Sequence, residues 1–345
     1  MRSRNLIRQL TKPVDDETLS SWLSRNATNP YVGSVHSVFL DSCQAMANAS
    51  LEGDVDRLCE HQRFLSCFAE RDQEVLANTF KLPDNLIEVG GSLNYCPQCL
   101  ADDVASMHAP AWRKAWRVRG NCFCAAHDEL VLFQRLSASG RGQFNRAWLA
   151  FSQHASTGKF IFGNHFIQRL ISLPETATKE QSLCRIVLKV MRWIDSAPDY
   201  PTYGRPSKQC LIFVLGFFLY RPFARCKGGV GQWFLNSLRS STELSSQPFR
   251  SPSVRELSEG IKDSTPRNIA VSYLFLGCAY KLLSEADIEL INNALYFSNA
   301  PFPRQPCELR ALACCFQPTR IFQFKQSASR NLYAGDIAHL DWLFG

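Results

Sequence analysis

A cluster of cysteines and one histidine between residues 96 and 127 constrains this chain more than any other feature of its sequence. Cys96 and Cys99 form a CxxC pair, and Cys124 and His127 form a CxxH pair. In a CxxC turn two thiolates can bind one metal ion while backbone amides hydrogen-bond the sulfurs. Three sulfurs and one imidazole nitrogen make a closed tetrahedral set, which leaves no position for a substrate water. The spacing therefore predicts one structural Zn²⁺ ion, whose binding energy contributes to folding.

Two other residues compete with this ligand set. Cys122 lies two residues before Cys124, and His108 lies between the two pairs. We favour Cys124, because a CxxH pair brings both ligands together over one short turn, and we expect Cys122 to be a buried thiol. Most of the remaining cysteines stand singly among apolar residues and are interpreted as small core residues. Trp112 and Trp116 are four residues apart and are expected on one helix face that packs under the metal site.

The overall composition is that of a folded protein. The chain has 345 residues, 46% of them hydrophobic and 20% charged, which argues against disorder and allows two domains. The net charge of +7 permits an acidic partner such as nucleic acid but does not require one. The N-terminus lacks the apolar segment of a signal peptide, and the longest apolar run, residues 210–220, is shorter than the about 20 residues of a membrane span. We expect a cytoplasmic protein with reduced thiols and a buried helix or strand at 210–220.

Apolar periodicity predicts a mainly α, multi-helical fold with one zinc-finger or zinc-ribbon insertion. A Pro- and Tyr-rich connector is expected at 197–206 and a short strand at 320–324. The predicted organisation is an N-terminal helical, helix-turn-helix-like segment (1–90), a zinc finger (91–137) and a C-terminal helical domain (138–345). The expected helices cover residues 13–29, 35–47, 53–70, 71–81, 143–155, 163–174, 177–196, 232–238, 254–263, 267–283 and 284–296.

The first of these helices has capping and amphipathic signals. Asp15 or Asp16 is expected to cap it, with Glu17 in the first turn. Its apolar residues have i, i+3, i+4 spacing, and they could belong to the core or contact a protein partner. This stripe consists of Leu19, Trp22 and Leu23. Its expected exposed neighbours are Ser20, Ser21 and Ser24.

The sequence lacks the common enzyme motifs. It contains no GxxxxGK[ST] phosphate-binding loop, no HExxH and no GxSxG. A Cys/His nucleophile pair would meet only in the folded chain and so has no sequence signature. Several aspartates could bind Mg²⁺ but are interpreted as helix caps and solvated side chains. They are Asp54, Asp56, Asp102, Asp103, Asp336 and Asp341. We therefore expect a protein without catalytic residues.

Two segments are candidates for contact with nucleic acid. Around the tryptophans, arginine and lysine could bind phosphates while an exposed ring stacks on bases; alternatively the rings are core and the basic groups are solvated. The candidate contact residues for nucleic acid or a partner are Trp112, Arg113, Lys114, Arg117 and Arg119. Residues 253–283 could form a helix-turn-helix whose second helix begins at Ser264-Thr265-Pro266, or a helical pair of the core.

In their order and spacing, these motifs resemble the zinc-finger signature of the TniQ/TnsD transposition proteins, which runs Cys-Pro-x-Cys-Leu, Trp-Arg, Cys-x-x-His and a leucine-rich end. The stretch at 16–27 (DETLSSWLSRNA), with His36 and Leu40 beyond it, is similar to the opening helix of that family. The resemblance covers residues 12–137. Many members carry a second cysteine pair, whereas residues 128–183 contain no cysteine. The matching positions are Cys96, Pro97, Cys99, Leu100, Trp116, Arg117, Cys124, His127, Leu130 and Leu132.

The resemblance implies a target-site selector of a transposon, which neither cuts nor joins DNA. Such proteins link a target-recognition element to the AAA+ regulator TnsC, which then admits the transposase. In one branch the recognition element is an RNA-guided CRISPR effector complex of the Cascade type, bound by a homodimer; in the TnsD-like branch the protein binds its target DNA directly. The intermediate length and modest charge favour the first branch. The expected partners are Cascade-type subunits with guide RNA, TnsC and a second copy of the chain, in a bacterial cytoplasm, with target DNA as the alternative.

Overall fold

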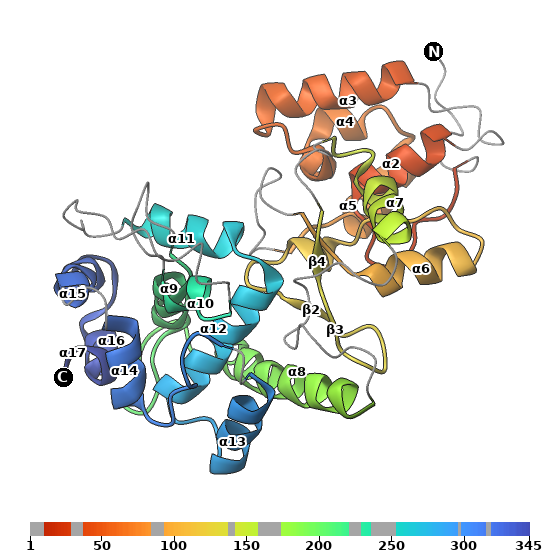
Figure 1. The fold of residues 1–345 in the computed structure, drawn as a ribbon. Helices are drawn as coiled ribbons and strands as arrows, with labels where there is room; N and C mark the ends of the chain where they lie inside the picture. The colour runs from red at the N-terminus through yellow and green to blue at the C-terminus, as the bar shows by residue number, and fades with distance from the viewer. Residues whose placement is uncertain are drawn as a thin grey trace. The chain divides into compact units, whose positions relative to one another are not determined.

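The computed structural model describes residues 10–28, 37–83, 93–136, 142–157, 174–220, 229–235, 253–295, 298–314 and 319–345. Contacts between Cα atoms divide the chain into two units. Unit 1 comprises residues 1–126 and 133–161, and unit 2 comprises residues 127–132 and 162–345. Helices dominate both units, which confirms the predicted fold class (Figure 1). The three-part division predicted from the sequence stays a prediction.

Unit 1 begins with helices that enclose an apolar core. These are α2 (Leu19–Thr28), α3 (Ser37–Ser50), the 3₁₀ helix η1 (Val55–Glu60), α4 (Gln62–Leu65) and α5 (Glu70–Thr79). The stripe residues Leu19, Trp22 and Leu23 are buried in this core with aromatic residues such as Phe64 and Phe80. The stripe is therefore part of the core of the unit, the simpler of the two interpretations that the sequence allows.

Short elements and one further helix follow in unit 1. They are β1 (Asn94–Tyr95), α6 (Pro97–Ala105), η2 (Lys114–Arg117), β2 (Phe123–Cys124), β3 (Val131–Leu132), β4 (Gln134–Arg135) and α7 (Arg146–Thr157), of which β3 falls in the segment counted with unit 2. β1 pairs antiparallel with β4, with Tyr95 opposite Gln134, and β2 pairs with β3. These two small sheets are the framework of the cysteine cluster.

Helix α2 begins later than predicted. Thr18 caps it, because its carbonyl accepts from Trp22 N at 3.1 Å and its hydroxyl accepts from Ser21 N at 3.4 Å. The prediction of a cap at Asp15 or Asp16, with Glu17 in the first turn, is wrong. Asp16 has a φ of +57°, which is outside the helical region. The cause is a tertiary pairing of the chain just before α2 with the segment that precedes η2.

That pairing joins two parts of unit 1 that are almost 100 residues apart in sequence. Thr18 N donates to Trp112 O at 2.9 Å, and Lys114 N donates to Asp16 O at 2.7 Å. The Asp16 carboxylate also accepts from Ala115 N at 2.8 Å. Glu17 and Arg113 form an isolated antiparallel bridge, and Asp16 before it has a positive φ, so residues 16–18 do not continue α2 toward the N-terminus.

The prediction that Ser20, Ser21 and Ser24 are exposed is also wrong. All three are buried. Ser20 N donates to the Asp56 carboxylate at 2.8 Å, and the Ser21 hydroxyl accepts from Trp112 N at 2.9 Å. Both faces of α2 are therefore covered, because small polar side chains can bond to the neighbouring segments without the cost of an unsatisfied group.

Other helix predictions are confirmed or corrected by the structure. The helix predicted over 53–70 is wrong in extent, since the extended backbone of His61 separates η1 from α4. The strand predicted at 320–324 is wrong, because these residues lie in α15. Trp112 and Trp116 do not share a helix face; Trp112 precedes η2, and the two rings pack edge to face at 5.2 Å. The helix predicted over 163–174 lies outside the described residues, except Pro174, where α8 begins.

Unit 2 is built around two apolar helices. Its helices are α8 (Pro174–Asp195), α9 (Lys208–Leu219), α10 (Val230–Trp233), α11 (Val254–Asp263), α12 (Pro266–Ala279), α13 (Glu285–Ala294), α14 (Pro306–Cys314), α15 (Thr319–Asn331), α16 (Ala334–Ala338) and α17 (Asp341–Phe344). The apolar run at 210–220 forms α9, as one of the two predicted alternatives. No helix in the described ranges combines the length and the apolarity that crossing a membrane requires.

Helix α12 contradicts the helix-turn-helix interpretation of residues 253–283. Every residue of α12 is buried, and the helix contacts α8 and α9 (Figure 1). A recognition helix needs an exposed face to enter a DNA groove. Since α12 is mostly apolar and covered on every side, it is a central core helix of unit 2.

Close packing of α11 on the end of α9 depends on a glycine. A Cβ placed on Gly260 would lie 2.8 Å from Leu219 O and 2.9 Å from Tyr220 Cα, closer than real Cβ atoms approach backbone. Backbone atoms at the end of a helix cannot move aside as a flexible side chain can. The helices therefore approach each other at a distance that only glycine permits.

We predict that Gly260→Ala destabilises unit 2 by about 1–3 kcal/mol, because overpacking outweighs the higher helix propensity of alanine. The matched control is Gly204→Ala, where no heavy atom lies within 4 Å of the new Cβ. Urea unfolding of both variants measures the difference. Equal stability of the two variants would contradict the packing argument.

Candidate metal centre

The CxxC pair lies where strand β1 turns into helix α6. Cys96 is the N-cap of α6, with an extended backbone and Pro97 as the first helical residue. Proline suits this position because its ring fixes a helical φ and its missing N–H has no partner there anyway. The Cys96 sulfur accepts from Cys99 N at 3.5 Å. The local sequence thus folds both sulfurs toward one point, in the way expected of a metal-binding CxxC turn.

The CxxH pair lies on the hairpin formed by β2 and β3. Cys124 ends β2, and His127 follows in the connection to β3. Phe133 N donates to Cys122 O at 2.9 Å, which closes the hairpin beside the cluster. The side chain of Cys124 is buried, and that of His127 is partly exposed.

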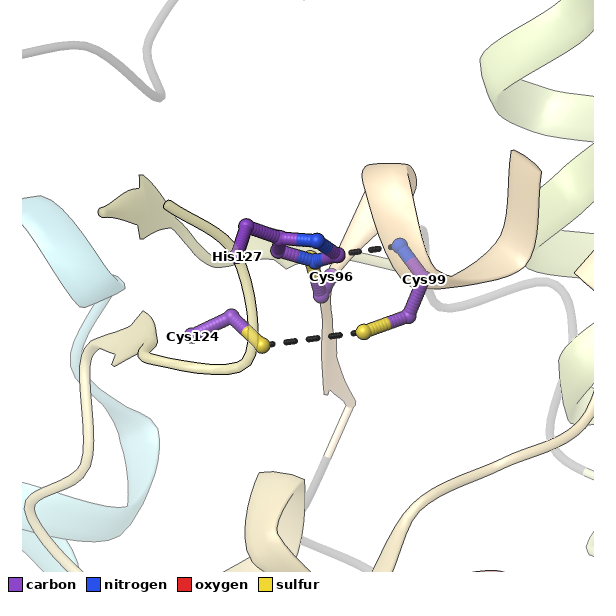
Figure 2. Close-up of side chains that lie close together, drawn as sticks. All are labelled: Cys96, Cys99, Cys124 and His127. Atoms are coloured by element: carbon purple, nitrogen blue, oxygen red, sulfur yellow. Dashed lines mark hydrogen bonds between the residues drawn. The ribbon is translucent and has the colours of Figure 1, made fainter. Parts of the chain in front are cut away.

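The four side chains converge at the distances that a tetrahedral metal site requires. The sulfurs of Cys99 and Cys124 are 3.6 Å apart, and the ligand atoms of all four residues lie within 4.8 Å of one another (Figure 2). Zn–S bonds of about 2.3 Å in a tetrahedron place two sulfurs about 3.8 Å apart. This buried cluster of Cys96, Cys99, Cys124 and His127 could therefore hold a metal ion.

The thiols of Cys96 and Cys99 stay protonated unless a positive charge joins them. Hydrogen bonding with Cys124, followed by hydrogen bonding with Cys99 and burial, raises the pKa of Cys96 far above its ordinary value. The interaction with Cys124, together with burial, raises the pKa of Cys99 to about 12. A divalent cation reverses this balance, since it stabilises the thiolates directly.

The two rival ligands are outside the cluster. Cys122 is fully buried, and His108 is exposed. Of the residues that the structure describes, those that form a metal-sized group of three or more potential ligands are the four of the predicted set. Cys122 is thus a buried thiol, as predicted.

A network of buried charges lies beside Trp112. Arg117 donates to the Asp54 and Asp56 carboxylates, each at 2.6 Å. Arg146 of α7 donates to Asp56 at 3.1 Å, and its guanidinium carbon lies 5.0 Å from the Trp112 ring centre. The side chains of this network are at most 9% exposed. Removing one charge would leave its partners buried without compensation.

The two carboxylates of the network differ in their protonation energetics. Burial alone would raise the pKa of Asp56, but Arg117 and Arg146 outweigh it and hold that pKa below its usual value. Asp54 has one arginine partner, so burial prevails and raises its pKa. Asp56 is therefore the carboxylate whose charge stabilises the folded chain.

The network was not predicted from the sequence. Arg117 stood among the candidate contact residues, and Asp54 and Asp56 were interpreted as caps or solvated side chains. Asp54 does cap η1, because it accepts from Asp56 N at 3.0 Å. Asp336 is likewise buried, and it accepts from Ser207 N at 2.8 Å. Local sequence patterns cannot predict such pairs, because the partners are far apart along the chain.

The five candidate contact residues have different exposures. Trp112 and Arg117 are buried inside unit 1. Arg113 pairs with Asp103 at 2.5 Å, and the Lys114 amine donates to Thr79 O at 3.0 Å. Arg119 is exposed. Arg119 is therefore the most available of the five for a contact at the surface, followed by Lys114 and Arg113, which are half-buried.

The comparison with known families agrees with this geometry. Residues 9–130 match the model of the TniQ family. This segment is a TniQ region. It spans both α2 and the cysteine cluster, and the pairing of residues 16–18 with the segment before η2 joins these two parts. No curated protein and no solved structure matched the chain.

We predict that Asp56→Asn destabilises the TniQ region by about 3–5 kcal/mol at neutral pH, because two buried arginines lose their shared partner. Glu60→Gln is the matched control, since Glu60 pairs with Arg57 at 3.1 Å but both side chains are 49% exposed. That change is expected to cost less than about 1 kcal/mol. Denaturant unfolding measures both, and similar losses would show that the buried network contributes little.

The lowered pKa of Asp56 also makes the stability of the folded chain depend on pH. Because the pKa of Asp56 is lower in the folded chain, its stabilisation is present above the ordinary value of about 3.9 and is lost as the pH falls through the lower folded value. Asp54 acts in the opposite direction and cannot cause this loss. Comparing unfolding free energies at about pH 5 and pH 3 should therefore show a smaller acid-induced loss for Asp56→Asn than for the unchanged chain. If the variant and the unchanged chain lose the same unfolding free energy between these pH values, groups other than Asp56 cause the loss.

Proposed function

We propose that this chain is a non-catalytic target-site selector of a transposon, with one structural Zn²⁺ ion in its TniQ region. The observation that supports this most strongly is the buried Cys₃His cluster within a segment that matches the TniQ family. Proteins of this family take part in transposition and are generally not enzymes. The chain would act by holding other components together.

The proposed ion is held by Cys96, Cys99, Cys124 and His127. All four positions of a tetrahedral site are filled by protein ligands, so the ion would fix the β1–α6 turn to the β2–β3 hairpin and leave no open coordination position. Its role would be structural, because the elements around it are too short to be stable alone. The two sheets have two residues in each strand.

The proposed partners are an RNA-guided, Cascade-type CRISPR effector complex and the AAA+ regulator TnsC, with the chain acting as a homodimer. The length and modest positive charge of the chain support this branch over a TnsD-like protein that binds its target DNA directly. The burial of α12 adds to the argument, because residues 253–283 do not offer an exposed recognition helix. Target DNA remains the partner to test if the effector complex does not bind.

Co-expression tests this choice of partner. The tagged chain is produced with a Cascade-type complex and guide RNA, purified, and analysed for zinc, effector subunits and RNA. One zinc per chain with stoichiometric effector and RNA is expected. Bound zinc without effector subunits or RNA would support the metal site but favour direct DNA binding over the effector complex. The affinity for target DNA, measured at several salt concentrations, would then test that alternative.

We predict that Cys96→Ala lowers both the zinc content and the melting temperature, because the remaining three ligands bind the ion more weakly and its binding energy contributes to folding. Cys122→Ala is the matched control, since both thiols are fully buried and Cys122 is outside the cluster. It should retain one zinc per chain. Equal zinc contents for the two variants would exclude the proposed ligand set.

We also propose that Arg119, with Lys114 and Arg113 beside it, contacts the partner or its nucleic acid. Arg119→Glu should weaken partner binding about tenfold or more, by removing an exposed positive charge and adding a negative one. Arg71→Glu is the control, because Arg71 is another exposed arginine of unit 1. Binding measured at two salt concentrations should show the loss only for Arg119→Glu. Equal binding by both variants would exclude Arg119 from the contact.

A further inference from the structure

Gln181 of helix α8 holds the backbone of Leu130 from both sides. Leu130 N donates to Gln181 Oε1 at 3.0 Å, and Gln181 Nε2 donates to Leu130 O at 3.0 Å. Both residues belong to unit 2. One side-chain amide thus satisfies the donor and the acceptor of a single residue, as a neighbouring strand would.

Leu130 lies in the connection that carries the histidine of the metal cluster. His127 is three residues before Leu130, and β3 begins at the next residue, Val131. The residues between them, Asp128 and Glu129, are exposed and lie in neither a helix nor a strand. The position of the imidazole therefore depends on what fixes the two ends of this short connection. Cys124 and β2 fix the first end. The second end is held by the pairing of β3 with β2 and, at Leu130 just before β3, by the two bonds from Gln181.

We propose that Gln181 is a positioning residue for the metal centre. It acts through the Leu130 backbone, which it holds in the conformation that places His127 beside the three sulfurs. The inference rests on the proposed zinc site and adds a residue that lies more than 50 positions from the nearest ligand and outside the segment that matches the TniQ family. Partners of this kind commonly change metal affinity by about 10–100-fold, and the lower end applies because Gln181 acts through the backbone.

The proposal has a reciprocal consequence. If the bonds between Gln181 and Leu130 favour metal binding, metal binding must favour those bonds by the same factor. Zinc should therefore slow hydrogen exchange at the Leu130 amide, which donates to Gln181. A purely structural attachment of the connection to α8 would protect this amide equally with and without the ion.

The test compares Gln181→Met with Lys189→Met. Methionine keeps the length of glutamine but can make neither bond to Leu130. Lys189 lies on the same helix, is 55% exposed and pairs with Asp287 at 3.3 Å, so its change tests for a general effect on α8. Zinc affinity is measured by competition with a chelator on the full chain. We expect about a tenfold loss for Gln181→Met and no loss for Lys189→Met.

Each outcome has a distinct meaning. Equal zinc affinity of Gln181→Met and the unchanged chain would overturn the role of Gln181 and leave the metal site intact. Failure of the unchanged chain to bind zinc would instead refute the metal site itself. If Gln181→Met does not fold, hydrogen exchange of the unchanged chain decides. Slower exchange at Leu130 with zinc supports the proposal, and zinc-independent exchange overturns it.

Discussion

The buried charges around Asp56 are the interaction on which the TniQ region depends. Two guanidinium groups, from Arg117 and Arg146, share two carboxylates, from Asp54 and Asp56, inside unit 1. Taking such charges out of water costs several kcal/mol for each ion, so the arrangement is favourable only when all partners are in place. The N-terminal helices supply the carboxylates, the segment between the metal-binding pairs supplies one arginine, and α7 supplies the other. These parts must therefore fold together, and they include α7, which lies outside the residues 9–130 that match the TniQ family.

The cysteine cluster connects parts of the chain that are closer together in sequence than those joined by the charge network. It joins the β1–α6 turn to the β2–β3 hairpin, two pieces of backbone that have few regular hydrogen bonds of their own. Trp112 connects the charge network to the N-terminal helices, since its ring packs against Trp116 and under Arg146 and its backbone bonds to Thr18 and Ser21. The network thus fixes the segment to the N-terminal core, and the cluster would fix the fold within the segment.

Sequence patterns predicted the features that depend on local spacing. The CxxC and CxxH pairs converge as their short turns require, and amphipathic periodicity located helices such as α3, α8 and α11. The predictions that were wrong share a cause, which is a partner far away in the sequence. Pairing with a distant segment sets the start of α2. Ser20 and Ser21 are buried because they bond to partners beyond position 50. The carboxylates that pair with Arg117 lie more than 60 positions away from it. A polar residue whose partner lies that far away has the same local pattern as an exposed one. Residues 320–324 are helical for a similar reason, because Phe324 packs against Phe213 and Phe217 of α9 and thereby overrides a weak strand preference.

The most direct test of this account is X-ray absorption at the zinc edge of the purified full-length chain. A Cys₃His site requires one zinc per chain with three sulfur ligands at about 2.3 Å and one nitrogen ligand at about 2.0–2.1 Å. Four sulfur ligands would show that Cys122 replaces His127. Oxygen ligands would show an open site, and absence of bound zinc would show that the fold of this segment does not depend on an ion; each of these results would contradict the account.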